Sequence, residues 1–270
     1  MTNRDLARTR LVLALLNPRS TCHRATIRGA EAVPRTGAAV LVSNHGRLDF
    51  DFFILIRLLL RERGRLVRLM ADHLWFTLPV TKRLFAAAGA VDGTRANAAR
   101  LLASGGLILA YPGGVREIMN SHFGREHIDW RGRRGFARLA LEAQVPVIPI
   151  AGIGVNNGLV FVSSGRWLGK LLFQRILRMG PKYADYRVPL AMGLLPLPLP
   201  YPLVIPLPLP CRVTYVVGEP ILPPPAERAD AGGGVSERQV EIFARQVERA
   251  MVRLIAEHGR HPTLRTGNPR

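Results

Sequence analysis

The sequence predicts a single α/β domain with a mostly parallel central sheet flanked by helices. From about residue 38 to residue 220, short apolar runs alternate with stretches whose apolar residues recur at helical spacing. Buried strands that alternate with helices are typical of βα units around a parallel sheet. With 270 residues, of which 48% are hydrophobic, the chain is long enough to bury one sizeable core.

The expected elements follow one another in a regular order. Strands are predicted over residues 38–43, 65–71, 107–111, 145–150 and 212–217. Helices are predicted over residues 52–60, 82–88, 95–103 and 134–143, and a last helix is expected to begin after Ser236. Ser236 and Gln239 have the pattern of a capping box. The last helix is amphipathic, and the apolar face that we expect to pack on the core is made by Val240, Phe243, Val247, Met251, Leu254 and Ile255.

Three segments are expected along the chain. In residues 1–36, the apolar run 11–16 follows several arginines and is too short to span a bilayer. We expect an interfacial helix there or, more simply, a packing helix. Residues 37–220 form the domain proper, and residues 221–270 form a linker and a C-terminal helix packed on the core.

Residues 190–210 are apolar for roughly the length of a membrane span. Prolines recur throughout this stretch, and each one removes a backbone donor and blocks a helix. Such a backbone cannot cross hydrocarbon exposed to lipid. The segment is therefore interpreted as an extended loop that lies on the protein or dips into a membrane interface, or as a buried connecting loop.

The charge of the chain favours anionic partners. The formal net charge is +19 and comes almost wholly from arginine. This attracts phospholipid headgroups, nucleotide phosphates or nucleic acid, and composition does not choose between them. Nucleic acid is disfavoured, because no helix-turn-helix, zinc-finger or aromatic-sheet signature accompanies the charge. Cys22 and Cys211 are far apart in the sequence, so neither a disulfide framework nor a thiolate metal site is expected.

Polar clusters follow the predicted strands, where open α/β sheets bind their ligands. The first cluster, residues 43–51, holds His45 with Asp49 and Asp51 a few residues on. A carboxylate bonded to one ring nitrogen fixes the tautomer and leaves the other nitrogen to accept a proton. By itself this pattern is also compatible with a solvated loop histidine.

The second cluster, residues 111–117, contains the adjacent glycines Gly113 and Gly114 followed by Arg116. Adjacent glycines let backbone N–H groups approach a phosphate or a developing oxyanion, and an arginine adds a bidentate donor. The alternative is a tight turn with a surface salt bridge. A third cluster ends at Arg95, and residues 129–136 form a further basic patch.

In this order, the clusters resemble the phospholipid/glycerol acyltransferase family. That family has an Asn-His-x4-Asp block, a block ending in arginine, a Phe-Pro-Glu-Gly-Thr-Arg block and a Val-Pro-Ile-x-Pro strand. The counterparts here are Asn44-His45 with Asp51, then residues 89–95, 111–116 and 145–149.

Two departures from the family pattern place the chain close to a divergent branch. The spacing from His45 to Asp51 is one residue longer than in the family block, and Gly113 stands where the family has glutamate. Together with the His-Gly start, the Pro-Gly-Gly-Val-Arg-Glu block and a Trp-x-x-Arg-x-Gly-Phe-Ala run at residues 130–137, these features are similar to diacylglycerol acyltransferase-like membrane proteins.

The resemblance implies an acyl-CoA-dependent O-acyltransferase that acylates a hydroxyl of a glycerolipid. The acceptor would be lysophosphatidic acid, another lysophospholipid, a monoacylglycerol or a diacylglycerol. His45 would be the general base and Asp51 its orienter, with Asp49 in reserve. Backbone donors of Gly113 and Gly114 would receive the oxyanion.

By the same resemblance, Arg95, Arg116 and Glu117 would bind the acceptor, most naturally through a phosphate. Acyl-CoA is a substrate, and no metal or other cofactor is implied. The expected place of action is the cytoplasmic face of a membrane, where the protein would be peripheral or monotopic on an anionic surface. The alternative is a non-catalytic basic peripheral protein that binds anionic membranes, which would explain the charge but not the ordered blocks.

Overall fold

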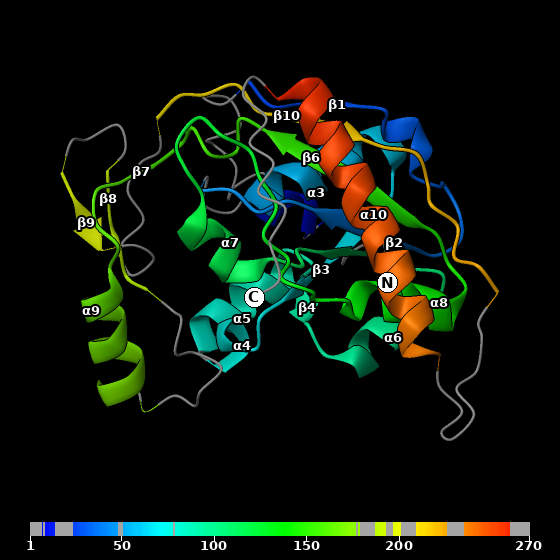
Figure 1. The fold of residues 1–270 in the computed structure, drawn as a ribbon, viewed down its shortest axis with the longest axis horizontal. Coiled ribbons are helices and arrows are strands. Elements are labelled where there is room, and N and C mark those ends of the chain that lie inside the picture. Colours follow the sequence, from blue (N-terminus) through cyan, green and yellow to red (C-terminus); the bar gives the residue numbers. More distant parts are fainter. Residues whose placement is uncertain are drawn as a thin grey trace.

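A seven-stranded sheet forms the centre of the molecule, with the strand order β1-β10-β6-β2-β5-β3-β4 (Figure 1). The computed structural model describes residues 7, 9–13, 24–47, 51–77, 79–176, 178, 187–192, 197–200, 209–225 and 235–259. The strands of the main sheet are β1 (Thr26–Arg28), β2 (Ala39–Ser43), β3 (Val67–Ala71), β4 (Val91–Asp92), β5 (Leu107–Ala110), β6 (Val147–Ile153) and β10 (Thr214–Val217). A smaller sheet contains β7 (Val160–Phe161), β8 (Leu190–Met192) and β9 (Leu199–Pro200).

Helices flank the two sheets. They are η1 (Ala30–Ala32), α3 (Asp51–Arg63), α4 (Leu74–Thr77), α5 (Pro79–Ala87), α6 (Arg95–Ala103), α7 (Gly114–Asn120), α8 (Gly135–Ala143), α9 (Arg166–Gly169), η2 (Lys170–Ile176) and α10 (Glu237–His258). Every pairing in the main sheet is parallel except that of β10 with β6. The prediction of a mostly parallel sheet flanked by helices, with a long C-terminal helix, is therefore confirmed.

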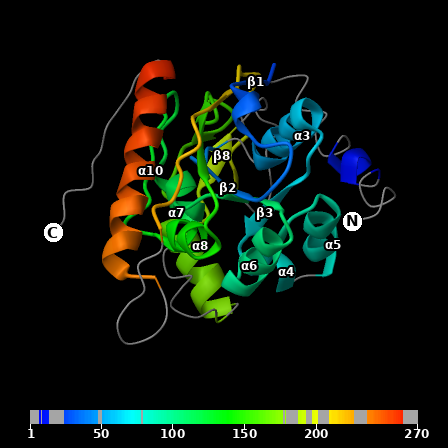
Figure 2. The ribbon, with the colours of Figure 1, turned by 90° about the vertical axis from the view of Figure 1, so that its right-hand side faces the viewer.

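Both faces of the sheet are covered. Along β2, Leu41 joins one apolar cluster, whereas Val40 and Val42 join the other. Helices α3 and α5 cover the first face, and α6, α8 and α10 cover the second (Figure 2). Because both faces are dry, the central strands β2, β5 and β6 have no polar alternation, and this is why they appear in the sequence as continuous apolar runs.

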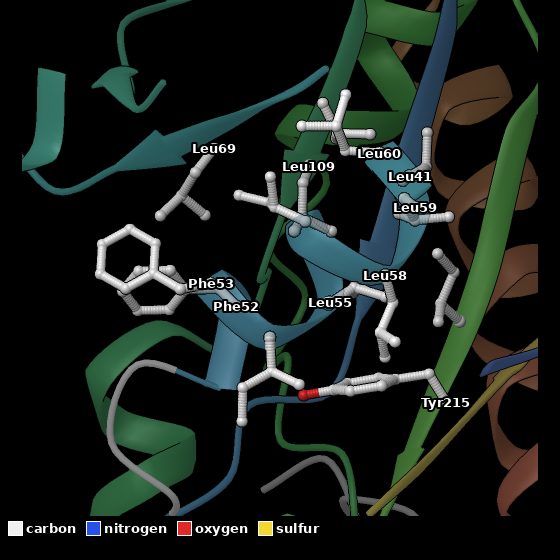
Figure 3. Packing of buried hydrophobic residues seen from close by; sticks show 14 of the residues in the cluster. Leu41, Phe52, Phe53, Leu55, Leu58, Leu59, Leu60, Leu69, Leu109 and Tyr215 are labelled. Atoms are coloured by element: carbon white, nitrogen blue, oxygen red, sulfur yellow. The ribbon is translucent and has the colours of Figure 1, made fainter. Parts of the chain in front are cut away.

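Helix α3 carries much of the first core. Its leucines and phenylalanines face Leu41, Leu69 and Leu109 of the sheet (Figure 3). Burial of one such side chain stabilises the fold by about 1.5–3 kcal/mol relative to its exposure to water. On the same face, the hydroxyl of Tyr215 donates a hydrogen bond to the backbone oxygen of Asp51 at 2.8 Å and so links β10 to the first residue of α3.

The predicted elements match the observed ones closely where local signals are strong. Helix α6 has the predicted bounds, because the hydroxyl of Thr94 accepts the backbone N–H of Asn97 and caps the helix. Helix α10 begins after Ser236 as expected, but Ser236 makes no side-chain cap hydrogen bond, and Gln239 donates instead to the backbone oxygen of Pro225. The capping-box interpretation was therefore wrong, although the apolar face does pack on the core.

Several elements were not predicted from the sequence. These are β1, β4, the small sheet, α4, α7, and the helix formed by α9 and η2. Within residues 190–210, the described parts contribute β8 and β9, so this stretch is partly sheet rather than only loop. In the N-terminal run, Leu13 is buried in the core and Leu11 is 60% exposed, while residues 14–16 lie outside the described residues. Of the helices in the described ranges, none is long and apolar enough to span a bilayer.

The topology gathers the polar clusters at one edge of the sheet. Strands β2, β5 and β3 are adjacent and parallel, so their carboxyl ends lie side by side. His45 follows β2, Tyr111 follows β5, and His73 follows β3. Segments that are far apart in the sequence therefore meet at a single place.

Candidate active site

A cavity of about 570 Å³ opens at this edge of the sheet. One part of its wall is apolar and contains Phe52, Trp75 and Phe85. Another part is polar and contains His45, His73, Asp92, Arg116 and Arg133. A cavity that combines an apolar wall with a few convergent polar groups is the usual form of a binding site for a small molecule or a lipid.

His45 lines this cavity and forms a pair with Asp51, which lies behind it and does not line the cavity. The Nδ1 atom of His45 lies 3.3 Å from Oδ1 of Asp51, and Asp51 is completely buried. This distance is long for a hydrogen bond, as catalytic contacts often are when no substrate is bound. Among the residues described, no other donor hydrogen-bonds to the Asp51 carboxylate. Asp49 lies outside the described residues.

Aromatic rings hold the imidazole of His45 in place. The ring of Tyr111 lies against it with centroids 4.4 Å apart, and the ring of Phe52 meets it edge-on at 6.1 Å. Burial, followed by the charges of Asp51, Tyr215 and Glu117, raises the pKa of Tyr111 well above its usual value. Tyr111 therefore contributes a neutral ring beside His45.

Asn44 anchors the loop that carries His45 to the neighbouring strand. Its side-chain amide donates to the backbone oxygen of Gly152 at 2.9 Å, and its Oδ1 accepts the N–H of Gly152 at 2.7 Å. All these groups are buried, so the two bonds satisfy polar atoms that would otherwise destabilise the core. The asparagine of the Asn-His pair is thus a structural residue that fixes the end of β2 to β6.

Arg47 anchors the other end of the same loop. Its Nε donates to Oγ of Ser121 at 2.8 Å, and its guanidinium carbon lies 4.4 Å from the ring centroid of Phe161. Its backbone N–H donates to the side chain of Asn156 at 3.1 Å. Burial lowers the pKa of Arg47 to about 10. Sequence reasoning missed this residue, because a buried arginine in a polar loop has no distinctive pattern.

Glu117 occupies a different place from the one expected. It was predicted to bind the acceptor, but its side chain is completely buried and does not line the cavity. Its Oε1 accepts the backbone N–H of Asp129 at 3.3 Å, and the carboxyl also interacts with the backbone N–H of His45. It also covers the Cα of Gly113 so closely that a Cβ on that residue would lie 2.6 Å from the Cβ of Glu117. Burial raises the pKa of Glu117 well above its usual range.

The predicted arginines separate into two groups. Arg116 lines the cavity, but the guanidinium of Arg95 pairs with Glu142 on α8 and does not line it. Arg133, which was noted only as part of a basic patch, lines the cavity and donates to the backbone oxygens of Pro112 and Gly113 at 3.1 Å each. The Trp-x-x-Arg run was the signal in the sequence that could have identified it.

The two glycines of the second cluster also differ from each other. Gly114 lines the cavity with a φ of 56°, a conformation that favours glycine. Its N–H donates to the backbone oxygen of Tyr111 at 3.0 Å. This N–H is therefore already used in a turn and is a poor candidate for an oxyanion donor. Gly113 is buried beneath Glu117 and does not line the cavity.

A second histidine–carboxylate pair lies in the same cavity. Nδ1 of His73 is 2.7 Å from Oδ2 of Asp92, and both residues line the cavity. The side chain of His73 is 62% exposed, in contrast to the 14% of His45. Sequence reasoning missed His73, although it follows a predicted strand just as His45 does. Groups of three or more potential metal ligands do not occur in the described part of the chain.

Comparison with known proteins shows that part of the sequence is similar to one family. Residues 24–152 match the family model described as Acyltransferase. The chain is 34% identical over 169 residues to a human protein named "DGAT1/2-independent enzyme synthesizing storage lipids", covering 63% of this chain and 48% of that protein. It is 32% identical over 179 residues to an uncharacterized protein of Mycobacterium tuberculosis, covering 64% of this chain and 49% of that protein. The chain thus spans about half the length of these relatives.

A solved structure has a related fold. The crystal structure of the 1-acyl-sn-glycerophosphate (LPA) acyltransferase PlsC from Thermotoga maritima aligns with a TM-score of 0.53 at 16% identity, covering 97% of this chain and 85% of that one. At this identity the likeness concerns the fold alone. The family itself rests on the sequence match, which contains His45, Asp51 and the glycine–arginine block. Residues 24–152 of the chain are therefore similar to the acyltransferase family.

Proposed function

We propose that this protein transfers an acyl group from acyl-CoA to a hydroxyl of a glycerolipid, with His45 as the general base. The observation that supports this best is the pairing of His45 with the buried Asp51, because His45 lines a cavity that has both apolar and cationic parts. The apolar wall suits an acyl chain, and the cations suit phosphate groups. The family match supports acyl transfer in general.

In the proposed reaction, Nε2 of His45 takes the proton from the acceptor hydroxyl. Asp51, which contacts Nδ1, fixes the ring and stabilises the imidazolium that forms. The hydroxyl oxygen attacks the thioester carbonyl, the carbon–sulfur bond breaks, and the leaving thiolate takes the proton from His45. We do not assign the oxyanion to the N–H of Gly114, because this N–H already donates to the backbone oxygen of Tyr111.

We propose a neutral acceptor, a mono- or diacylglycerol, rather than lysophosphatidic acid. The pairing of Arg95 with Glu142 leaves Arg116 and Arg133 as the cavity cations, and we assign these two to the phosphates of acyl-CoA. The name of the human relative, which refers to storage lipids, supports a neutral product. His73 with Asp92 is assigned to binding the polar part of the acceptor.

The test uses purified protein, labelled acyl-CoA and a panel of phosphorylated and neutral acceptors, with the products separated by headgroup. His45→Ala should abolish transfer. His258→Ala is the matched control, because His258 is an exposed histidine near the end of α10. Full activity of a folded His45→Ala protein would refute the assignment of the base.

Two further variants test the finer assignments. Asp51→Asn keeps the shape of the side chain and removes its charge, so it should lower kcat strongly. Arg116→Ala should raise the KM for acyl-CoA equally with every acceptor. If Arg116→Ala instead impaired only phosphorylated acceptors, the arginine would bind the acceptor and the neutral-acceptor assignment would be wrong.

A further inference from the structure

Helix α9 continues into η2 without a break and forms one helix from Arg166 to Ile176. Figure 1 shows this helix beside the small sheet β7–β8–β9, away from the main sheet. Gly165 precedes the helix, and its backbone oxygen accepts the N–H of Gly169 at 2.9 Å and that of Val188 at 3.1 Å. Gly169 and Phe173 are buried, so one face of the helix is held against the protein.

The outer face of this helix and the sheet beside it expose large apolar side chains. Trp167 is 75% exposed and Ile176 is 62% exposed. Val162, which follows β7, and Leu197, which precedes β9, are also more than half exposed. Exposed apolar groups that gather on one part of a surface mark a site of interaction. Tryptophan in particular is enriched where an apolar medium meets water.

The same region is strongly basic. Arg166, Lys170 and Arg175 are exposed on the helix, and the sequence contains no aspartate or glutamate between Glu142 and Asp185. Partial burial, followed by the positive charges of Arg166, Arg131 and Arg116, lowers the pKa of Arg187. Because Arg116 lines the cavity, positive charge extends from this helix to the cavity wall.

We propose that the docking helix, residues 166–176, and the small sheet beside it bind the surface of an anionic lipid bilayer. Aromatic and aliphatic side chains next to lysine and arginine are the composition of helices that lie in a membrane interface. An anionic bilayer satisfies both features, because its headgroups pair with the cations while its interior takes up Trp167 and Ile176. This inference deepens the proposed function, since it places the lipid source beside the cavity, but its test needs no turnover.

Vesicle binding without an acyl donor tests the docking helix. We expect binding to vesicles of equimolar phosphatidylcholine and phosphatidylserine and much weaker binding to phosphatidylcholine alone. The triple variant Arg166→Glu/Lys170→Glu/Arg175→Glu should bind the anionic vesicles at least about a hundredfold more weakly, since each cation near such a surface contributes roughly a fivefold factor.

The matched control is Arg238→Glu/Arg249→Glu/Arg253→Glu on α10, which makes the same change in net charge. These arginines are exposed, and α10 lies on the side of the molecule opposite α9 in Figure 1. The control should retain most of the binding. Equal loss in both triple variants would mean that net charge alone drives binding and would overturn the proposal, as would normal binding by the docking-helix variant.

Tryptophan fluorescence gives a second readout. The chain has three tryptophans, of which Trp130 is buried and Trp75 is half-buried. Anionic vesicles should shift the emission to the blue, and Trp167→Phe should remove this shift. Ile176→Ala should weaken binding severalfold, whereas Ile242→Ala, at a similarly exposed position on α10, should not. A shift that persisted in Trp167→Phe would exclude insertion of this helix.

Two outcomes separate this inference from its alternatives. If the free protein were a dimer and Trp167→Ala caused it to dissociate, the surface would bind a second copy of the chain and the proposal would be wrong. His45→Ala should bind vesicles like the wild type. If the wild type binds vesicles but transfers no acyl group, the proposed reaction is refuted, whereas the proposal of the docking surface is not.

Discussion

Replacing Glu117 with alanine tests how the interior of the site is supported. The buried carboxyl accepts the N–H of Asp129, interacts with the N–H of His45 and covers Gly113. In Glu117→Ala both N–H groups lose this partner, and a donor left without a partner in the protein interior costs about 1–3 kcal/mol. We therefore expect the free energy of unfolding to fall by about 2–5 kcal/mol. For a chain of this length, each kcal/mol lowers the Tm by about 2–4 °C, so the Tm should fall by roughly 4–20 °C.

Glu117→Gln is the control and also tests the protonation of this residue. Glutamine keeps the shape of the side chain and an acceptor oxygen. The Glu117→Gln protein should therefore retain the stability and activity that the Glu117→Ala protein loses. Because burial raises the pKa of Glu117, the folded protein binds the proton more tightly than the unfolded chain does. This tighter proton binding adds to the free energy of unfolding. The contribution is fully present below the unfolded-state pKa of about 4.3 and is lost as the pH rises through the folded-state pKa. Glutamine does not titrate, so Glu117→Gln should gain stability relative to wild type as the pH rises.

The assay is urea unfolding of the wild type and the two variants at a series of pH values, followed by circular dichroism, with kcat measured in parallel. The reasoning fails if Glu117→Ala unfolds with the same free energy as the wild type. It also fails if the difference between wild type and Glu117→Gln does not change with pH.

Three further predictions concern neighbouring residues. Gly113→Ala should lower the free energy of unfolding by about 1–3 kcal/mol through overpacking against Glu117, and clearly less in a Glu117→Gly background, which removes the Cβ as well as the carboxyl group; additive losses would contradict this contact. Asn44→Ala should lower the free energy of unfolding in urea by about 2–4 kcal/mol, because it leaves both backbone groups of Gly152 without their side-chain partners. A loss below about 1 kcal/mol would show that these two hydrogen bonds do not anchor the loop. His73→Ala should raise the KM for the acceptor about tenfold with little change in kcat, whereas a loss of kcat as large as that of His45→Ala would exchange the two roles.

Much of the scaffold could be predicted from local patterns. Helix α6 is defined by its own cap at Thr94, and strands β2, β5 and β6 are defined by apolar runs that are buried on both faces. The antiparallel direction of β10 has no local signal, because the identity of a strand's residues does not determine the direction of its neighbour. The helix from Arg166 to Ile176 was not predicted either. Its outward face is both apolar and basic, so its sequence does not show the usual separation of an apolar face from a polar one.

The sequence by itself identified His45, Asp51 and the glycine–arginine block as the candidate site, because these residues follow strand ends in the order of a known family. Only the tertiary structure decided what each side chain faces. Arg116 and Glu117 are adjacent in the sequence, but successive helical residues point about 100° apart, so one lines the cavity and the other supports the His45 loop from below. Arg95 pairs with Glu142, while Arg133 reaches the cavity from a different loop. Side-chain direction depends on which distant segments pack together, and that information is absent from the spacing of residues along the chain.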